Sequence, residues 1–246
     1  MRRIGLILTI LGLIPVLIYG GLTLAFRTDA IGFGTVFGSL GWLVPALGLG
    51  GLLALVGGVL MLVQRAVFPG LVSLLVGIIA FAMAAGPVQM RQTASEVPPI
   101  HDITTDTDDP PAFVAILPLR ADAPNPPEYD RAQTEAQLGY YDLAPALIER
   151  PAPEVFEIAR AALEAEGLRL VAAAPREGRL EAVATTRWFG FKDDVVVRVR
   201  DAHGIAAIVD VRSKSRMGRS DVGANAARIE AILTRIEEAA GAGAGA

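Results

Sequence analysis

The distribution of charge constrains this chain more than any motif does. Its first 90 residues carry only five charged side chains, which are Arg2, Arg3, Arg27, Asp29 and Arg65. Lipid offers no water to backbone N–H and C=O groups, so an apolar run of about 20 residues crosses a bilayer as a helix. The sequence therefore predicts a membrane domain over residues 1–92 and a water-soluble domain over residues 93–240.

Three apolar runs in the membrane domain are long enough to span a bilayer, at residues 4–26, 40–63 and 71–90. The first resembles a signal peptide in its position. However, the apolar core of a signal peptide is only about 7 to 15 residues long, and two more apolar runs follow here. We therefore expect three retained transmembrane helices, with the lipid bilayer as a partner of the chain.

Three spans would place the two ends of the membrane domain on opposite sides of the bilayer. Arg2, Arg3 and Arg65 would share one side, and Arg27 and Arg91 the other. Cytoplasmic flanks usually carry more Lys and Arg. The difference of one residue predicts that the soluble domain faces away from the cytoplasm.

Small residues recur at helical spacing in the second span, where Gly50, Ala54 and Gly58 share one face. Such residues let helices approach closely in lipid. We expect them to pack the three helices of one chain together rather than to form a dimer interface. No ionisable side chain lies in the middle of a span, which argues against transport by this chain alone.

The remaining chain is acidic and contains no cysteine. Of the 22 basic and 26 acidic residues, four and one precede residue 91, which leaves 18 and 25 and a net charge of −7. Nucleic-acid binding usually needs a basic face, and only the stretch around Arg212, Lys214, Arg216 and Arg219 could supply one, so no nucleic-acid partner is expected. The absence of cysteine excludes disulfides and cysteine-ligated zinc.

The soluble domain begins with a proline- and aspartate-rich wrapping segment, residues 98–153, which predicts extended chain folded around the domain. Hydrophobic periodicity then predicts a helix at 154–166 and strands at 168–173, 179–187, 195–200 and 205–211. Ser220 is the expected N-cap of a last helix. Residues 241–246 alternate glycine and alanine, so we expect a disordered tail there.

Short turns between the predicted strands favour antiparallel neighbours. The element order predicts two helices that cover one face of the sheet. The predicted fold class is therefore a membrane-anchored α+β protein, with three transmembrane helices followed by an antiparallel sheet covered by two helices.

Polar residues concentrate between residues 210 and 228. Asp221, Asn225 and Arg228 recur at helical spacing, so they point partly toward the sheet. Buried polar groups need partners, so the favoured interpretation is a network that pins the junction between strand and helix. The alternative is a functional site. The candidate cluster comprises His101, Asp102, Asp106, Arg212, Ser213, Ser215, Arg216, Asp221, Asn225 and Arg228.

Three residues of this cluster lie nearest the membrane domain: His101, Asp102 and Asp106. Their imidazole and carboxylate groups could bind a hard cation or act in acid–base catalysis. No metal-binding spacing accompanies them, and aspartates beside prolines are ordinary turn residues. A serine hydrolase is disfavoured because no GxSxG motif is present. We therefore assign no catalytic residue, metal or cofactor.

An aromatic loop, Trp188, Phe189, Phe191 and Lys192, connects two predicted strands. Amphipathic rings are favoured at the level of lipid headgroups, so this loop is a candidate membrane or partner contact. The competing interpretation is that its rings cap the open end of the core.

Several motifs are similar to those of domain-of-unknown-function family 1499. They are residues 100–106 (IHDITTD), 109–113 (DPPAF), 191–198 (FKDDVVVR) and 210–218 (DVRSKSRMG), followed by Asp221, Gly223, Asn225 and Arg228. The resemblance covers about residues 98–236. It implies a bacterial envelope protein without an established activity. Together with the three spans and the distribution of arginines, this predicts a multi-pass protein of the inner membrane with a periplasmic domain.

Two functions follow as hypotheses. The first is an extracytoplasmic binding or scaffolding module, whose envelope protein or lipid-linked partner contacts the 212–228 junction or the aromatic loop. The second is a membrane-tethered hydrolase or metal-assisted enzyme, in which the His101 and aspartate cluster meets residues 212–228 in one cleft. Convergence of the two segments in a cleft would favour the enzyme.

Overall fold

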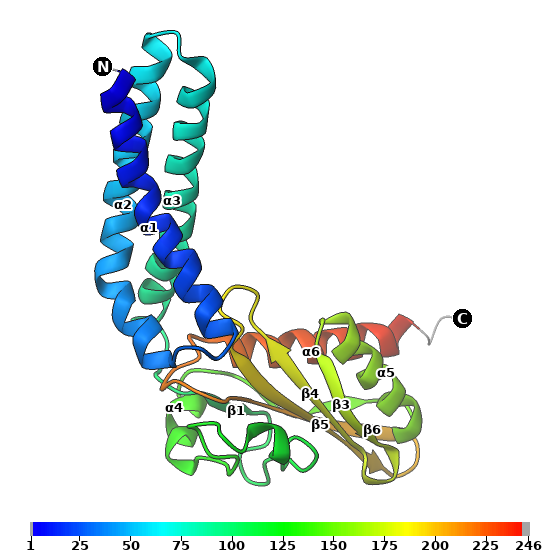
Figure 1. The fold of residues 1–246 in the computed structure, drawn as a ribbon. Helices are drawn as coiled ribbons and strands as arrows, with labels where there is room; N and C mark the ends of the chain where they lie inside the picture. The colour runs from blue at the N-terminus through cyan, green and yellow to red at the C-terminus, as the bar shows by residue number, and fades with distance from the viewer. Residues whose placement is uncertain (1, 243–246) are drawn as a thin grey trace. The chain divides into compact units, whose positions relative to one another are not determined.

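The computed structural model describes residues 2–242 and divides into two compact units, Met1–Thr93 and Ala94–Ala246. Three long helices form the amino-terminal unit: α1 (Arg2–Arg27), α2 (Phe33–Val63) and α3 (Val67–Thr93). All three are long and apolar enough to cross a membrane. The three predicted spans are therefore present as helices (Figure 1).

Two helix starts differ from the sequence prediction. The second span was expected to begin at residue 40, but α2 already begins at Phe33. Likewise the third span was expected to begin at residue 71, but α3 begins at Val67 and includes Pro69 and Gly70 in its first turns. Proline is compatible with the first turn of a helix, because the N–H groups of that turn have no acceptor within the helix.

Glycine packs the three helices of the amino-terminal unit together. A Cβ atom added to Gly50 would lie 2.8 Å from Cγ of Pro15 in α1, and one added to Gly58 would lie 3.0 Å from the carbonyl oxygen of Gly70 in α3. The two glycines of α2 thus serve two different neighbours. The expected packing within one chain is confirmed for these positions.

The carboxy-terminal unit is built on an antiparallel sheet with the strand order β1-β6-β5-β4-β3, and β2 pairs with the other end of β6. The strands are β1 (Asp102–Thr104), β2 (Ala146–Ile148), β3 (Arg169–Ala174), β4 (Arg179–Thr185), β5 (Lys192–Ala202) and β6 (Ala206–Ser215). The four predicted strands are β3 to β6. The wrapping segment adds β1 and β2, which the sequence did not predict as strands.

Helices α5 (Ala152–Ala165) and α6 (Ala224–Ala242) cover one face of the sheet, here called the helix face (Figure 1). Their apolar stripes meet alternate residues of the strands. Phe156 and Ile229 are buried in the same core as Val197 and Val209. This is the predicted α+β arrangement of an antiparallel sheet with two helices.

The opposite face of the sheet, here called the wrapped face, lies under the wrapping segment. This segment contains the short helices η1 (Leu117–Arg120), η2 (Arg131–Gln133) and α4 (Thr134–Leu138). Its apolar contribution is small, since only Phe113 and Ile116 join Val183 and Val196 in a second core. Charged side chains fill most of the remaining interface, as described below.

The sequence analysis placed the start of the disordered tail too early, at residue 241. Helix α6 continues through Ala242, and Ala240 is still buried at its end. The last four residues of the predicted tail, 243–246, lie outside the described residues.

Candidate functional site

Strand β6 divides the predicted polar cluster between the two faces of the sheet. Side chains alternate along a strand, so Ser213 and Ser215 lie on the helix face, whereas Arg212 and Arg216 lie on the wrapped face. Strand β1 pairs with β6 in the register Asp102↔Lys214. The segments that the sequence analysis singled out are therefore neighbours, but their side chains form two separate networks.

Asn225 is the centre of the network on the helix face. Its Oδ1 accepts hydrogen bonds from Ser213 Oγ (2.7 Å) and Arg228 Nη1 (2.6 Å), and its Nδ2 donates to Ser215 Oγ (3.0 Å) and the carbonyl of His101 (3.1 Å). Arg228 also pairs with Asp193 at 2.8 Å. Every hydrogen-bonding position of the Asn225 amide is thus used to join α6 to β6 and β1.

Asp221 caps α6 in place of the expected Ser220. Its Oδ1 accepts from the backbone N–H of Gly223 and its Oδ2 from that of Asn225, while Ser220 Oγ bonds only to Val222 N–H. Burial raises the pKa of the Asp221 carboxyl, and these backbone hydrogen bonds only partly oppose the shift. Burial and Asp221 together raise the pKa of Tyr141 to about 12.

On the wrapped face, Asp102 joins two cations of β6. Arg212 donates from Nε and Nη2 to its two oxygens at 2.8 and 2.9 Å, and Lys214 Nζ donates at 2.9 Å. Arg212 and Lys214 also bond to carbonyls of the wrapping segment. Burial alone would raise the pKa of Asp102, but the hydrogen bonds and charges of Arg212 and Lys214 outweigh it and hold that pKa below its usual range.

A second buried carboxylate, Asp194 of β5, was not in the predicted cluster. Arg216 donates to it from Nε at 3.0 Å and from Nη2 at 2.7 Å, and Arg120 Nη1 lies 3.3 Å away. Arg120 comes from η1 in the wrapping segment, whose backbone carbonyl at Leu119 accepts from Arg216. The pair therefore ties the wrapping segment to the centre of the sheet.

Glu181 of β4 is a third buried carboxylate that the sequence analysis missed. Its oxygens accept the consecutive backbone N–H groups of Val114, Ala115 and Ile116 at 2.9 to 3.1 Å, and it pairs with Arg179. Three consecutive N–H groups around one carboxylate form an anion-binding concavity of the backbone. Glu181 thus holds the middle of the wrapping segment.

Asp106 has a turn role and an ion-pair role, and neither needs a metal. Its Oδ1 accepts from Asp108 N–H and Asp109 N–H, while its Oδ2 accepts from Arg198 Nη2 at 3.1 Å. Arg198 also binds the buried Asp210 at 2.9 Å. No group of three or more His, Cys, Asp or Glu side chains suited to a metal occurs among residues 2–242.

Two glutamines of the wrapping segment cover the outer edge of β1. Gln137 accepts from the backbone N–H of Thr104 at 3.1 Å and donates to its carbonyl at 2.6 Å, as a neighbouring strand would. Gln133 accepts from His101 N–H at 2.8 Å, and its amide nitrogen lies 3.2 Å from His101 Nδ1. The edge of β1 is thereby closed to pairing with another chain.

The aromatic loop joins β4 to β5 and ends directly before Asp193 and Asp194, which belong to the networks of the helix face and the wrapped face. The rings of Phe189 and Phe191 stack with centroids 5.6 Å apart, and both side chains are partly buried. Trp188 is 69% exposed, and the neighbouring Arg187 and Lys192 are also exposed. The loop therefore combines an exposed ring with exposed cations.

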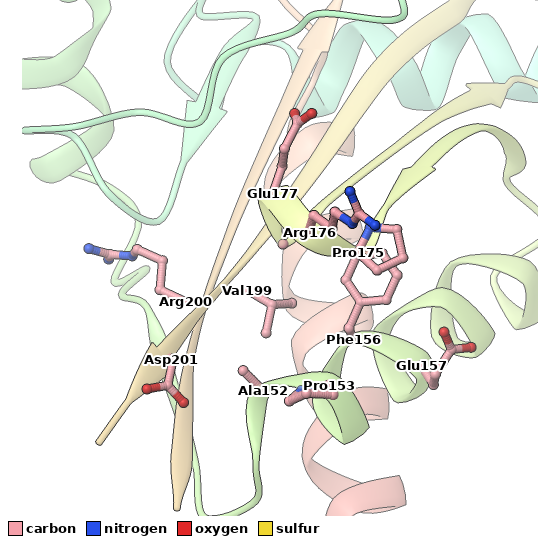
Figure 2. Close-up of a pocket in the computed structure, with 11 residues that line it drawn as sticks. Ala152, Pro153, Phe156, Glu157, Pro175, Arg176, Glu177, Val199, Arg200 and Asp201 are labelled. Atoms are coloured by element: carbon pink, nitrogen blue, oxygen red, sulfur yellow. The ribbon is translucent and has the colours of Figure 1, made fainter. Parts of the chain in front are cut away.

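A surface pocket of about 730 Å³ opens between the start of α5 and the turn before β4 (Figure 2). Figure 2 shows Phe156, Pro175 and Arg176 together on one side, with Arg200 and Asp201 on the other. None of the sequence-predicted site residues lines it. Arg200 binds Asp210 at 2.9 Å, so its charge is already engaged.

A family comparison matches residues 102–236 to "Protein of unknown function (DUF1499)". This match covers more than half of the chain, and it confirms the resemblance seen in the sequence motifs. The chain belongs to this family. Comparison with curated proteins gave no match.

The matched DUF1499 region begins at Asp102 in β1 and ends at Ile236 in α6, so it contains the whole sheet and all but the first four residues of the wrapping segment. The polar residues behind the resemblance hold these parts together. Asp102 and Arg212 join the wrapping segment to the sheet, and Asn225 and Arg228 join α6 to it. The hydrogen bonds of these four residues thus connect parts of the same unit.

Proposed function

We propose that this DUF1499 protein is a membrane-anchored binding or scaffolding module of the bacterial inner membrane, with its carboxy-terminal unit on the periplasmic side. The aromatic loop is its contact for an envelope protein or a lipid-linked partner. The observation that supports this choice is the exposure of Trp188 between the exposed cations Arg187 and Lys192. An exposed ring beside cations suits the boundary between water and anionic headgroups.

Within the other predicted contact, the 212–228 junction, residues 212–216 form a poor binding surface. Arg212, Ser213, Lys214, Ser215 and Arg216 are all buried. Their donors and acceptors bind residues of the same unit. A partner would therefore have to displace the wrapping segment or α6 before it could reach them, at the cost of several hydrogen bonds.

The enzyme hypothesis has less support. His101 and Asp102 do lie beside β6, but Asp102 faces Arg212 and Lys214 on the wrapped face, whereas Ser213 and Asn225 bond on the helix face. The sheet therefore separates the Asp102 carboxylate from Ser213 and Asn225, although the carbonyl of His101 accepts from Asn225. These residues do not line the pocket in Figure 2.

Fluorescence quenching in bilayers tests the role of the aromatic loop. The full chain with Trp42→Phe retains Trp188 as its only tryptophan. The matched control also carries Trp188→Phe and places tryptophan at Ile205, an exposed residue at the other end of β5. We expect headgroup-labelled lipid, or a purified lipid-linked or protein partner, to quench or shift Trp188 but not the control. Equal responses of the two probes would contradict the proposal.

Reporter fusions test the proposed side of the membrane. A fusion after Ser95 should be active with an alkaline phosphatase that folds only outside the cytoplasm. It should be inactive with a reporter that works only inside. The opposite pattern would place the carboxy-terminal unit in the cytoplasm.

A further inference from the structure

Two loops meet at one end of the sheet: the aromatic loop and residues 216–220, here called the 216–220 loop. The N–H of Arg216 donates to the carbonyl of Lys192 at 3.1 Å. Asn125 of the wrapping segment fixes the 216–220 loop, because its Nδ2 donates to the carbonyl of Gly218 at 3.0 Å. The backbones of the two loops are therefore held side by side.

The exposed charged side chains of these two loops are all cationic. Lys192 and Arg219 are exposed, and neither forms a salt bridge in the described part of the chain. Arg187 is a third exposed cation, next to Trp188, which is 69% exposed. Neither loop contains an aspartate or a glutamate. Arg187, Lys192 and Arg219 are here called the basic patch.

The basic patch is local, because the unit that carries it is not basic. Residues 98–153 contain three basic and ten acidic residues, and residues 154–246 contain fourteen of each. The carboxylates that follow Lys192, those of Asp193 and Asp194, are buried and already pair with arginines. Lys192 and Arg219 therefore remain available to an anion outside the protein.

The chain enters the carboxy-terminal unit beside the 216–220 loop. The N–H of Asp221 donates to the carbonyl of Ile100 at 3.0 Å, and Ile100 follows the last residue of α3, Thr93, by seven positions. Seven residues extend over at most about 25 Å. This short tether keeps the basic patch within reach of the membrane that α3 is proposed to cross, whatever the arrangement of the two units.

From the basic patch, the exposed ring beside it and the short tether, we infer that the two loops bind the anionic phospholipid headgroups of the bilayer that anchors the protein. This inference rests on the proposed function and specifies the partner of the aromatic loop as lipid. Lys192 and Arg219 attract the anionic headgroups, since a cation near such a surface is stabilised by its negative potential. Trp188 lies at the boundary between headgroups and acyl chains, where indole rings are favoured.

Fluorescence quenching in nanodiscs tests this inference. The full chain with Trp42→Phe is placed in phosphatidylcholine, or in an equal mixture with phosphatidylglycerol, each with the same trace of a neutral lipid that is spin-labelled on its headgroup. We expect quenching of Trp188 to be at least about threefold stronger in the anionic nanodiscs, and high salt to remove this gain.

Variants assign the gain to the basic patch. Lys192→Gln and Arg219→Gln should each lose about half of the gain or more, because each removes one cation. Arg219→Lys keeps the charge and should keep the gain. Arg176→Gln is the matched control, since it removes an exposed arginine at the other end of β4, and it should respond as the parent does.

The outcomes separate this inference from the proposed function. Equal quenching of Trp188 in the two kinds of nanodisc, or a full gain in both Gln variants, would overturn the inference and leave the loop as a membrane contact. No quenching in either nanodisc would also overturn it, and would leave a protein as the partner in the proposed function. Equal quenching of Trp188 and of the control tryptophan at Ile205 would overturn both. The salt dependence is measured on the parent, so it does not depend on the folding of any variant in the patch.

Discussion

The two faces of the same sheet are stabilised in different ways. On the helix face, α5 and α6 bury aliphatic residues such as Val197 and Ile229, and polar groups gather only at one end around Asn225. On the wrapped face, a segment with little periodicity is held by three buried carboxylates, Asp102, Asp194 and Glu181. A regular helix can rely on an apolar stripe, whereas an irregular segment must satisfy its backbone groups individually.

This difference explains why the family motifs are rich in charge. Irregular chain exposes N–H and C=O groups that no helix or sheet satisfies. Here Glu181 binds three such N–H groups, and Arg212 binds the carbonyls of Pro111 and Pro127. The charged residues of the sheet therefore act as the hydrogen-bond partners of the wrapping segment.

Loss of a carboxylate on the wrapped face should have the largest effect. Asp102→Ala leaves Arg212 and Lys214 buried without their shared counter-charge, so we expect a loss of about 3–5 kcal/mol in the free energy of unfolding. Denaturant unfolding followed by circular dichroism measures it. Asp108→Ala, which removes an exposed carboxylate, is the control and should change stability by less than about 0.5 kcal/mol. Similar losses in both variants would contradict the assigned role of Asp102.

Loss of the neutral Asn225 amide on the helix face should have a smaller effect. Asn225→Ala leaves Ser213, Ser215 and Arg228 without one partner each, but no buried charge loses its only counter-charge because Arg228 keeps Asp193. We expect a loss of about 2–3 kcal/mol by the same measurement. A loss larger than that of Asp102→Ala would reverse the ranking of the two faces.

The stability contributed by one buried carboxyl on each face, Asp102 and Asp221, should change with pH in opposite directions. The pKa of Asp102 is lowered on folding, so its contribution is present above the unfolded pKa of about 3.9 and is lost as pH falls through the folded pKa. The pKa of Asp221 is raised, so its contribution is complete below about 3.9 and is lost as pH rises through the folded pKa.

Stability curves of the parent, Asp102→Asn and Asp221→Asn between about pH 3 and pH 7 check this contrast. Relative to Asp102→Asn, the parent should gain stability as pH rises. Relative to Asp221→Asn, it should lose stability over the range above about pH 4. Two difference curves of the same sign would show that one assignment is wrong.

The smallest effect is expected on the outer surface of α5. Arg160 pairs with Glu157 and Glu164 at 2.8 and 3.0 Å, but all three side chains are exposed to solvent. Water and salt screen such pairs, so Arg160→Ala should unfold together with the parent. A clear loss of stability would mean that exposed ion pairs also contribute to stability, so that burial would not explain the difference between the faces.

The helix face could largely be predicted from the sequence. Hydrophobic periodicity located the central parts of β5 and β6, and the helical spacing of Asp221, Asn225 and Arg228 placed these residues partly toward the sheet. The network around Asn225 was the favoured interpretation of these residues. These patterns predict structure because the side chains of a strand or a helix return to the same face at a fixed period.

The wrapped face could be predicted only in part. Asp210, Arg212, Lys214 and Arg216 occupy every second position along the last half of β6 and the residue after it, which is a sequence signal for one charged face. Their partners on the wrapping segment, above all Arg120, gave no such signal, because that segment has no period. The backbone carbonyls that accept from these side chains could not be predicted either, because every residue has a carbonyl and the sequence does not mark which one is used.

Hydrogen exchange of the wrapping segment tests most directly whether the buried charges hold it on the sheet. We predict slow exchange at Val114, Ala115 and Ile116 in the parent, because their N–H groups bind the buried Glu181. Exchange at these positions should become fast in Glu181→Ala while the amides of α5 stay protected. Fast exchange already in the parent, or unchanged exchange in Glu181→Ala, would contradict the account.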